Sequence, residues 1–243
     1  MVLQALKSML DESENIVFFG GAGVSTESGI PDFRSEAGIY ETEGGRSYPP
    51  EYLLSHSFFV REPGEFYKFY RSKMIYPDAK PNNAHIALAR LEDRGKLKAV
   101  VTQNIDGLHQ AAGSKNVLEL HGSVHRNYCM ECGREYAIES VTESKTMVPR
   151  CDSCRGIIRP DVVLYEEQLD SEVMRRAADY ISAADMLIVG GTSLVVNPAA
   201  SFVSLYTGKR LVLINKSPTP YDDTACLVIN DSIGRVLDGV VSH

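Results

Sequence analysis

Four of the five cysteines form two Cys-x-x-Cys pairs. Cys129 and Cys132 make the first pair, and Cys151 and Cys154 make the second after eighteen intervening residues. Four thiolates at this spacing can converge on one tetrahedral Zn²⁺. Disulfides and a redox dithiol are the alternatives, but disulfides are rare in the cytosol and a redox motif needs no second copy. Because four thiolates leave no position for water, we expect a structural zinc.

Two glycine-rich segments each follow an apolar run. The first lies in Phe18–Tyr40, FFGGAGVSTESGIPDFRSEAGIY. Its Gly21 and Gly23 match the dinucleotide fingerprint G-x-G-x-x-G, whereas Thr26 replaces the third glycine. The second segment contains Gly190–Gly191. Glycines let main-chain N–H groups approach a phosphate, and the next helix adds its positive end. The two segments together predict a ligand with two nucleotide-like halves or a pyrophosphate.

Several polar side chains lie just beyond predicted strands. His121 precedes Gly122, and an imidazole with an ordinary pKa near 6.5 can accept a hydroxyl proton at neutral pH. Asp106 can accept an amide N–H, and Asn215 can bond a ribose hydroxyl. Arg34 offers a forked cation for phosphate or carboxylate. We expect only surface or packing roles for the other histidines, which are His56, His85, His109, His125 and His243.

Six short apolar runs predict strands buried on both faces of a parallel sheet, because their apolar residues do not alternate with polar ones. They are Ile16–Phe19, Ala99–Thr102, Val117–Leu120, Met186–Val189, Leu211–Ile214 and Leu227–Ile229. Helical patterns lie between most of them, the clearest with Asn83 as N-cap and Gly95 as its end. The fifth cysteine, Cys226, is expected to be buried. The pattern predicts a Rossmann-like, doubly wound α/β fold with its ligand at the carboxyl ends of the strands.

Two stretches interrupt the alternation of strands and helices. Residues 36–80 are aromatic, contain prolines and have a helical pattern without a strand, whereas residues 122–158 hold the paired cysteines. We expect both to be insertions, one helical and one a zinc ribbon, that form a smaller domain. The Rossmann-like nucleotide-binding domain would then consist of residues 1–35, 81–121 and 159–243.

The composition excludes several classes of protein. The 243 residues carry a formal net charge of −7, which argues against nonspecific binding to nucleic acid or to an anionic membrane. The cysteine-rich segment from Gly122 to Pro160 has six basic and five acidic residues, so it has no nucleic-acid footprint either. No apolar run reaches the length of a membrane span. The N-terminal MVLQALKSMLDESEN predicts a helix rather than a signal peptide, and we expect a cytoplasmic protein.

Five blocks of sequence, in this order, resemble the sirtuins, the NAD-dependent protein-lysine deacylases. The blocks are GAGVSTESGIPDFRS, TQNIDGLHQAAGS, LELHGS, the pair CMEC and CDSC, and GTSLVVNPAA. The resemblance extends from about Glu14 to Arg235. It accounts for the altered fingerprint, because sirtuins consume NAD as a substrate and must expose its bond to nicotinamide. It implies NAD and one structural zinc per chain.

The resemblance assigns a role to each matching position. The NAD phosphates and nicotinamide ribose would be contacted by Ala22, Thr26, Phe33, Arg34 and Gln103. The nicotinamide pocket would be lined by Ile30, Asn104, Ile105 and Asp106, with Asp106 holding the carboxamide. The adenosine half would be bound by Thr192, Ser193 and Asn215 and covered by Ser232 or Ile233. His121 would be the general base.

The implied reaction is the removal of acetyl groups from lysines of protein substrates. In the family, the acyl oxygen attacks the ribose carbon as nicotinamide leaves, and the base then activates a ribose hydroxyl. The products are free lysine, nicotinamide and O-acetyl-ADP-ribose. A dehydrogenase would show the third fingerprint glycine and an acidic residue after the second strand, and neither is visible. An NAD-dependent ADP-ribosyltransferase and a deacylase of another acyl group remain as alternatives.

Two segments bear on the substrate. In RPDVVLYEEQL, Val162, Val163 and Tyr165 would pair with the peptide as a strand, but Glu166 replaces a common glycine and cannot adopt positive φ cheaply. Succinyl-selective relatives carry Tyr-x-x-Arg on a helix. Here Arg71 follows the tyrosine by four residues in EFYKFYRSK, a rotation of about 100° from that position. The implied acyl group is therefore small and neutral.

Overall fold

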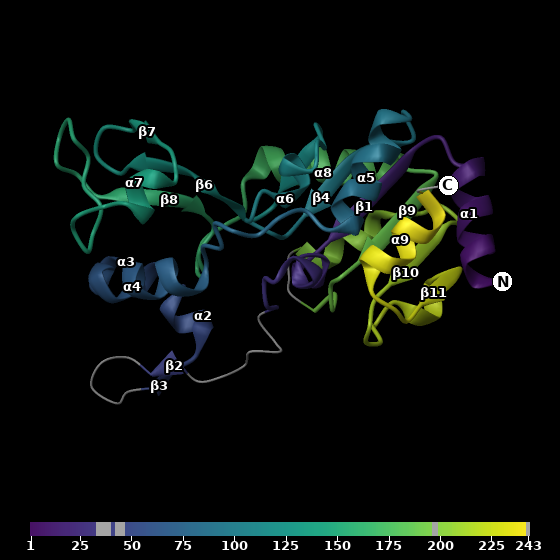
Figure 1. The fold of residues 1–243 in the computed structure, drawn as a ribbon, viewed down its shortest axis with the longest axis horizontal. Helices are drawn as coiled ribbons and strands as arrows, with labels where there is room; N and C mark the ends of the chain where they lie inside the picture. The colour runs from purple at the N-terminus through teal and green to yellow at the C-terminus, as the bar shows by residue number, and fades with distance from the viewer. Residues whose placement is uncertain (33–39, 42–46, 196–198, 242–243) are drawn as a thin grey trace.

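The computed structural model describes residues 1–32, 40–41, 47–195 and 199–241. A larger α/β part carries a smaller part at one side, which contains β6 to β8 and α2 to α4 (Figure 1). The expected NAD contacts Phe33 and Arg34 lie outside the described residues. In the described part of the chain, no helix is long and apolar enough to cross a membrane.

The larger part is built on one parallel sheet of six strands with the order β11-β10-β9-β1-β4-β5. The strands are β1 (Ile16–Gly20), β4 (Leu97–Thr102), β5 (Val117–Glu119), β9 (Met186–Gly190), β10 (Leu211–Ile214) and β11 (Leu227–Ile229). All six correspond to the predicted apolar runs. The doubly wound α/β fold is therefore confirmed.

Helices cover both faces of the sheet, and β1 is fully buried between them. On one face Phe18 packs in a cluster with α1 (Val2–Glu12), α5 (Asn83–Asp93) and α9 (Ile233–Val241). On the other face Phe19 packs with α8 (Ser171–Ala183) and η3 (Ala199–Leu205). Because successive residues of β1 face opposite layers, a continuous apolar run is required there.

The start of α5 differs from the prediction by one residue. The N-cap is Asn82, whose side chain accepts a hydrogen bond from the N–H of Ala84 at 2.9 Å. His85 Nδ1 accepts the N–H of Asn82 at 3.2 Å and completes a capping box. Asn83, the predicted cap, is the first helical residue. The helix ends as predicted before Gly95, which has a φ of 74°.

The two insertions pack against each other. The cysteine-rich one forms an antiparallel sheet in the order β7-β6-β8, with β6 (Gly122–Cys129), β7 (Glu135–Tyr136) and β8 (Ile158–Val162). It also contains α7 (Glu139–Thr142). The helices of the other insertion are α2 (Pro50–Leu53), α3 (His56–Arg61) and α4 (Pro63–Lys73). Buried aromatic residues of these helices share one cluster with Val124, Val141 and Val162.

Two expectations about local structure were wrong. The first insertion does contain strand pairing, since β2 (Tyr40–Glu41) and β3 (Ser47–Tyr48) form a short antiparallel ladder. Two-residue strands carry too little periodicity to be read from sequence. Cys226 is exposed rather than buried, and its thiol donates to the carbonyl of Leu211 at 3.2 Å. It directly precedes β11, and an edge strand leaves neighbouring side chains open to solvent.

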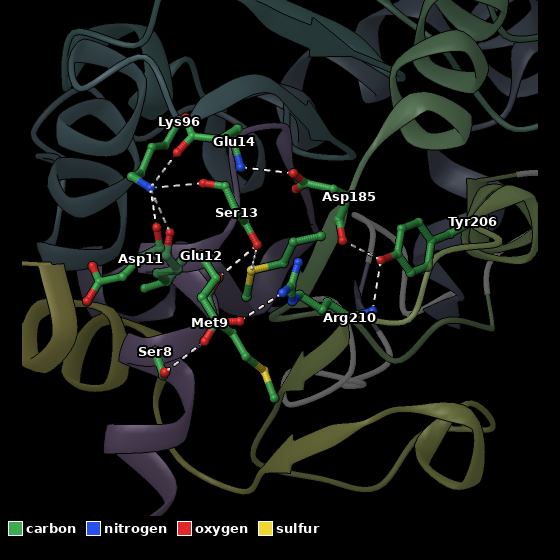
Figure 2. Close-up of polar contacts among 12 residues, drawn as sticks. Ser8, Met9, Asp11, Glu12, Ser13, Glu14, Lys96, Asp185, Tyr206 and Arg210 are labelled. Carbon is green, nitrogen blue, oxygen red and sulfur yellow. Dashed lines mark hydrogen bonds and ion pairs between the residues drawn. The ribbon is translucent and has the colours of Figure 1, made fainter.

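Polar groups fasten α1 to the amino ends of the strands (Figure 2). The ammonium of Lys96 donates to the carbonyls of Leu10, Asp11 and Ser13, at 3.1, 2.8 and 2.9 Å. The last carbonyls of a helix have no partner within the helix, and they carry the negative end of its dipole. Lys96 therefore stabilises the end of α1 from the start of β4.

A second set of contacts fixes the entry into β1. One carboxylate oxygen of Asp185 accepts the N–H groups of Glu14 and Asn15, at 2.9 and 3.1 Å. The hydroxyl of Tyr206 donates to the carbonyl of Asp185 and accepts the N–H of Arg210, both at 3.0 Å (Figure 2). Side chains thereby connect the segments that enter β1, β9 and β10.

Candidate functional site

A cleft with a volume of about 1160 Å³ runs along the carboxyl ends of the strands and continues into the smaller part. Its walls include every described residue that the sequence analysis named for NAD, catalysis or peptide. They are Ala22, Thr26, Ile30, Gln103, Asn104, Ile105, Asp106, His121, Val162, Val163, Tyr165, Thr192, Ser193, Asn215, Ser232 and Ile233. The fold thus brings these residues to one place, as expected for a ligand site of an open α/β sheet.

The two predicted glycine segments touch each other at the base of the cleft. The N–H of Gly23 donates to the carbonyl of Gly191 at 2.8 Å. A Cβ atom on Gly23 would lie 2.8 Å from the Gly191 Cα atom. Gly191 itself has a φ of 60°, and a Cβ there would lie 2.3 Å from the nitrogen of Val24. Close packing of the two loops therefore requires these glycines, besides any approach to phosphate.

Asp106 belongs to a hydrogen-bonded group in the wall of the cleft. One carboxylate oxygen accepts the hydroxyl of Ser25 at 2.6 Å, and the other accepts the N–H of Leu108 at 2.9 Å. Asn104 Nδ2 donates to the same hydroxyl at 3.0 Å. A carboxylate has about four acceptor sites, so Asp106 can still receive an amide N–H. Sequence reasoning missed Ser25, which is 1% exposed.

Asn215 lines the cleft directly after β10. Its Oδ1 accepts the N–H of Thr192 at 2.9 Å, which fixes the orientation of the amide. Its buried Nδ2 has no partner among the residues that the structure describes. Gln103 Nε2 donates to the Thr192 hydroxyl at 3.1 Å. A buried donor without a partner is costly unless a ligand completes it, so Asn215 fits a ribose or adenine acceptor.

One hydrogen bond fixes the tautomer of the neutral His121 ring. Its Nδ1 lies 2.8 Å from the carbonyl oxygen of Gln103. A carbonyl only accepts, so Nδ1 carries the hydrogen and Nε2 keeps the lone pair in the neutral ring. Burial lowers the pKa of His121, and the hydrogen bond to the Gln103 carbonyl raises it in part. The ring is therefore neutral at neutral pH and can accept a proton at Nε2.

In the segment predicted to bind the peptide, some main-chain groups are already hydrogen-bonded within the protein. The N–H of Val163 donates to the carbonyl of His121 at 3.0 Å. Tyr165 donates its N–H to the carbonyl of Leu54 and accepts the N–H of His56, each at 3.0 Å. A peptide that docks here must therefore pair with other main-chain groups of the segment.

Glu166 adopts the backbone conformation that the sequence analysis considered costly. Its φ is 76°, in the left-handed region that glycine favours. Its carboxylate accepts the N–H and the hydroxyl of Ser57, at 2.9 and 2.6 Å. These bonds lower the pKa of Glu166 and connect it to the first turn of α3. The two hydrogen bonds of the Glu166 side chain thus offset the backbone strain, which a glycine at this position would not have.

The four paired cysteines form one cluster. Their sulfur atoms all lie within 4.8 Å of one another, and no other candidate metal cluster occurs in the described ranges. The Cys129–Cys154 and Cys132–Cys151 sulfur distances are 3.4 and 3.7 Å. Tetrahedral zinc with bonds of about 2.3 Å requires about 3.8 Å between sulfurs. The Tyr136 hydroxyl lies 3.1 Å from the Cys151 sulfur and also contacts the Asp152 carboxylate, an outer layer of contacts typical of metal thiolates. The cluster therefore fits a closed zinc site.

Arg71 and Tyr67 are used for packing within the smaller part. The Arg71 guanidinium donates to the carbonyls of Val141 and Met147, both at 2.8 Å. The buried hydroxyl of Tyr67 donates to the carbonyl of Ile158. Neither side chain is free to hold an acidic acyl group, in keeping with the predicted preference for a small neutral one.

Two of the remaining histidines pack in the interior, and a third lines the cleft. His85 and His109 are buried with ring centroids 4.7 Å apart. Burial lowers the pKa of His85 to about 4 and that of His109 to about 3, so both pack as neutral rings. His125 is exposed but lines the cleft, a position that nothing in its local sequence indicated.

Comparison with known proteins places these features in one family. The Sir2 family model matches residues 21–198. NAD-dependent protein deacetylases of Clostridium acetobutylicum and Clostridium perfringens are 61% and 62% identical, over 98% of this chain and 98% of each relative. The NAD-dependent protein deacetylase of Cutibacterium acnes is 52% identical, over 99% of this chain and 98% of its own.

Solved structures agree in fold. A Sir2 protein with deacetylated p53 peptide and 3′-O-acetyl ADP-ribose is 41% identical with a TM-score of 0.87, covering 98% of both chains. A Sir2 complex with p53 peptide and NAD⁺ is 40% identical with a TM-score of 0.87, covering 100% of this chain and 98% of the other.

Proposed function

This chain belongs to the Sir2 family, and from that membership we propose that it is an NAD-dependent protein-lysine deacetylase with His121 as its general base. One observation carries the proposal. His121 lines the cleft with a lone pair on Nε2, and it is bonded both to Gln103, among the residues assigned to NAD, and to Val163, among those assigned to the peptide. Relatives with the same fold are named for this activity or were solved with its substrates and product.

His121 acts after nicotinamide has left. The acetyl oxygen of the lysine attacks the ribose carbon of NAD and releases nicotinamide. His121 Nε2 then accepts a proton from a ribose hydroxyl, and the hydroxyl oxygen attacks the carbonyl carbon of the acetyl group. The lysine amine leaves with a proton, and one water molecule adds to that carbon, so that the products are free lysine and O-acetyl-ADP-ribose. The hydrogen bond from Nδ1 to Gln103 supports this role, because it stabilises the ring as it becomes positively charged.

NAD is held from both ends of the cleft in this proposal. Asp106 accepts the nicotinamide carboxamide, while Ser25 and Leu108 keep its carboxylate in place. Asn215 donates from Nδ2 to the adenosine half. The remaining contacts are assigned as in the sequence analysis, with Phe33 and Arg34 outside the described residues. These are Ala22, Thr26, Ile30, Gln103, Asn104, Ile105, Thr192, Ser193, Ser232 and Ile233.

The two insertions form the small domain, and the substrate docks between it and the Rossmann-like domain. We assign residues 36–80 and 122–158 to the small domain and residues 1–35, 81–121 and 159–243 to the nucleotide-binding one. Val162, Val163 and Tyr165 border the peptide. The cysteine cluster would hold zinc as a structural ion, because all four positions are filled by thiolates. Thiols that must stay reduced favour a cytosolic location.

The test is incubation of the protein with NAD and an acetyl-lysine peptide, followed by mass spectrometry. We expect deacetylated peptide, nicotinamide and O-acetyl-ADP-ribose in equal amounts, and no reaction without NAD. Peptide that gains ADP-ribose and keeps its acetyl group would instead identify an ADP-ribosyltransferase. A matched succinyl-lysine peptide should react far more slowly, because its carboxylate would lose hydration on entering the acyl site and Arg71 already donates to main-chain carbonyls.

A further inference from the structure

The first strand of the zinc-binding insertion is bonded directly to the loop that carries Asp106. The N–H of Val124 donates to the carbonyl of Ile105 at 3.0 Å. One residue further along β6, His125 Nε2 lies 3.0 Å from the main-chain oxygen of Asp106. Two consecutive residues of β6 therefore hold two consecutive carbonyls of the loop.

The His125 contact has a defined donor. Since the carbonyl of Asp106 can only accept, Nε2 of His125 must carry the hydrogen. The His125 ring also lies against Gly107, where a Cβ atom would be 2.7 Å from the ring Cδ2. Gly107 has a φ of 72°, so glycine is favoured there for its conformation as well as for the space that the ring occupies.

The carboxylate and the main chain of Asp106 are thus held from different sides. Ser25 and Leu108 bond the carboxylate; Ser25 follows β1, and Leu108 is the first residue of α6 (Leu108–Ala111), which follows β4. Only His125 among the described residues is seen to bond the Asp106 carbonyl, and it belongs to β6 of the other sheet. The position of the carboxylate in the cleft depends on both sets of contacts.

We propose that His125 is a positioning residue for nicotinamide, which acts by fixing the main chain of Asp106 and Gly107. The proposal rests on the proposed function, in which Asp106 accepts the carboxamide. His125 needs no contact with the reacting atoms for this role. Its loss should weaken the binding of the nicotinamide group more than it slows acetyl transfer, because His121 and Gln103 are bonded independently of it.

The experiment compares three variants at this position. His125→Gln keeps an amide donor of similar reach, His125→Leu keeps apolar bulk on Gly107 without a donor, and His125→Ala keeps neither. Arg126→Ala is the matched control, because Arg126 follows in β6 and pairs with Glu119 and Asp161 instead of with the loop. For each protein we would measure the KM for NAD, the KM for peptide, kcat, inhibition by nicotinamide and the melting temperature.

We expect the Leu and Ala variants to need about three- to tenfold more nicotinamide for half-inhibition, the range for loss of one hydrogen bond. The KM for NAD should rise in parallel, with smaller changes in kcat and in the KM for peptide. His125→Gln should recover most of the difference. Arg126→Ala should leave nicotinamide inhibition unchanged even if its melting temperature falls.

Unchanged nicotinamide inhibition in His125→Leu would overturn the proposal, and so would equal weakening in Arg126→Ala. A Gln variant as weak as the Leu variant would also exclude the hydrogen bond as the cause. If the wild-type protein left acetyl-lysine untouched, the proposed function would fail by itself. The shift in melting temperature caused by nicotinamide would still compare the four variants, and equal shifts in all of them would overturn the role of His125.

Discussion

The two ends of the large sheet contain similar kinds of polar side chain in different states of hydrogen bonding. At the amino ends, the Lys96 ammonium donates to three main-chain carbonyls, and one Asp185 oxygen accepts two N–H groups. At the carboxyl ends, Asn215 keeps a donor that no described residue accepts, and His121 keeps a lone pair. Polar groups at the amino ends therefore stabilise the fold, whereas those at the carboxyl ends await a ligand. One group at the amino ends is an exception, since the second oxygen of Asp185 has no partner in the described chain.

The largest effect should come from removal of His121, whose Nε2 lone pair accepts the proton. His121→Ala should lower kcat for deacetylation by about 100- to 10,000-fold, the range for loss of a general base. NAD affinity and melting temperature should change little, because the base does not hold the cofactor or the core. Single-turnover assays at saturating NAD and calorimetric titration would check this. Substantial peptide turnover by the variant would contradict the assignment.

Substitution of a cysteine in the cluster should instead lower the stability of the fold. Cys151→Ala should lower the melting temperature by about 5 °C or more, since a structural metal site contributes to folding free energy. Elemental analysis should find one zinc per wild-type chain and less in the variant. Cys226→Ala is the control, and its stability should match wild type because this exposed thiol lies outside the cluster. Wild-type protein without zinc would contradict the prediction.

The amino end of the sheet should respond in stability alone. Lys96→Met keeps the apolar stem but leaves three carbonyls at the end of α1 without their donor. We expect a loss of about 1–2 kcal/mol in unfolding free energy, because charge-assisted bonds are strong and this one is partly exposed. Chemical denaturation would measure it. A changed KM for NAD would show that the two ends of the sheet are not independent.

His85 and His109 test whether a missing partner alone indicates function. Both are buried with nitrogen atoms that have no partner in the described residues. Their pKa values lie near 4 and 3, whereas unfolded histidine titrates near 6.5. Below pH 6.5 the unfolded chain therefore binds more protons than the folded one. The contribution of these two neutral rings to the free energy of unfolding should be fully present above pH 6.5 and should decrease as the pH falls toward 4.

The nearby carboxylates of Asp106 and Glu27 oppose this fall by favouring the charged form of His85. His109→Phe should flatten the loss of stability between pH 6.5 and 4, as followed by thermal melting across pH. It should leave deacetylation at pH 8 nearly unchanged. An equally steep profile in the variant would assign the acid sensitivity to other groups.

The smallest effect is expected at Glu166, where strain and hydrogen bonding oppose each other. Glu166→Ala keeps the positive φ and loses both bonds to Ser57, so its melting temperature should fall slightly. Glu166→Gly relieves the strain and should melt above the Ala variant. The KM for peptide should differ less than threefold from wild type in both. A Gly variant less stable than the Ala variant would show that the left-handed conformation costs nothing here.

Patterns confined to a few neighbouring residues predicted much of this molecule. Continuous apolar runs identified the six strands of the large sheet, because burial on both faces removes the alternation of side chains. The cysteine spacing identified the cluster, since two short turns fix both pairs. Boundaries were less certain, as the shift of the α5 cap from Asn83 to Asn82 shows.

Contacts between distant segments could not be predicted in the same way. Ser25 meets Asp106 across 81 positions of the chain, and His125 meets it across 19. Neither residue has a spacing that indicates the contact. The resemblance to sirtuins supplied candidate residues for the cleft, but only the fold shows which of their hydrogen-bonding groups are already used. The peptide segment is the clearest case, because Val163 and Tyr165 are bonded within the chain.

The central place of β1 also determines the order in which the chain can fold. Its neighbours are β4 and β9, and Ile16 pairs with both Leu97 and Met186. During synthesis β1 therefore leaves the ribosome long before its second neighbour exists. One edge of a fully apolar strand stays unpaired until about three quarters of the protein has been made, and unpaired edges of this kind favour aggregation. Chains that end before β9 should depend on chaperones to remain dispersed.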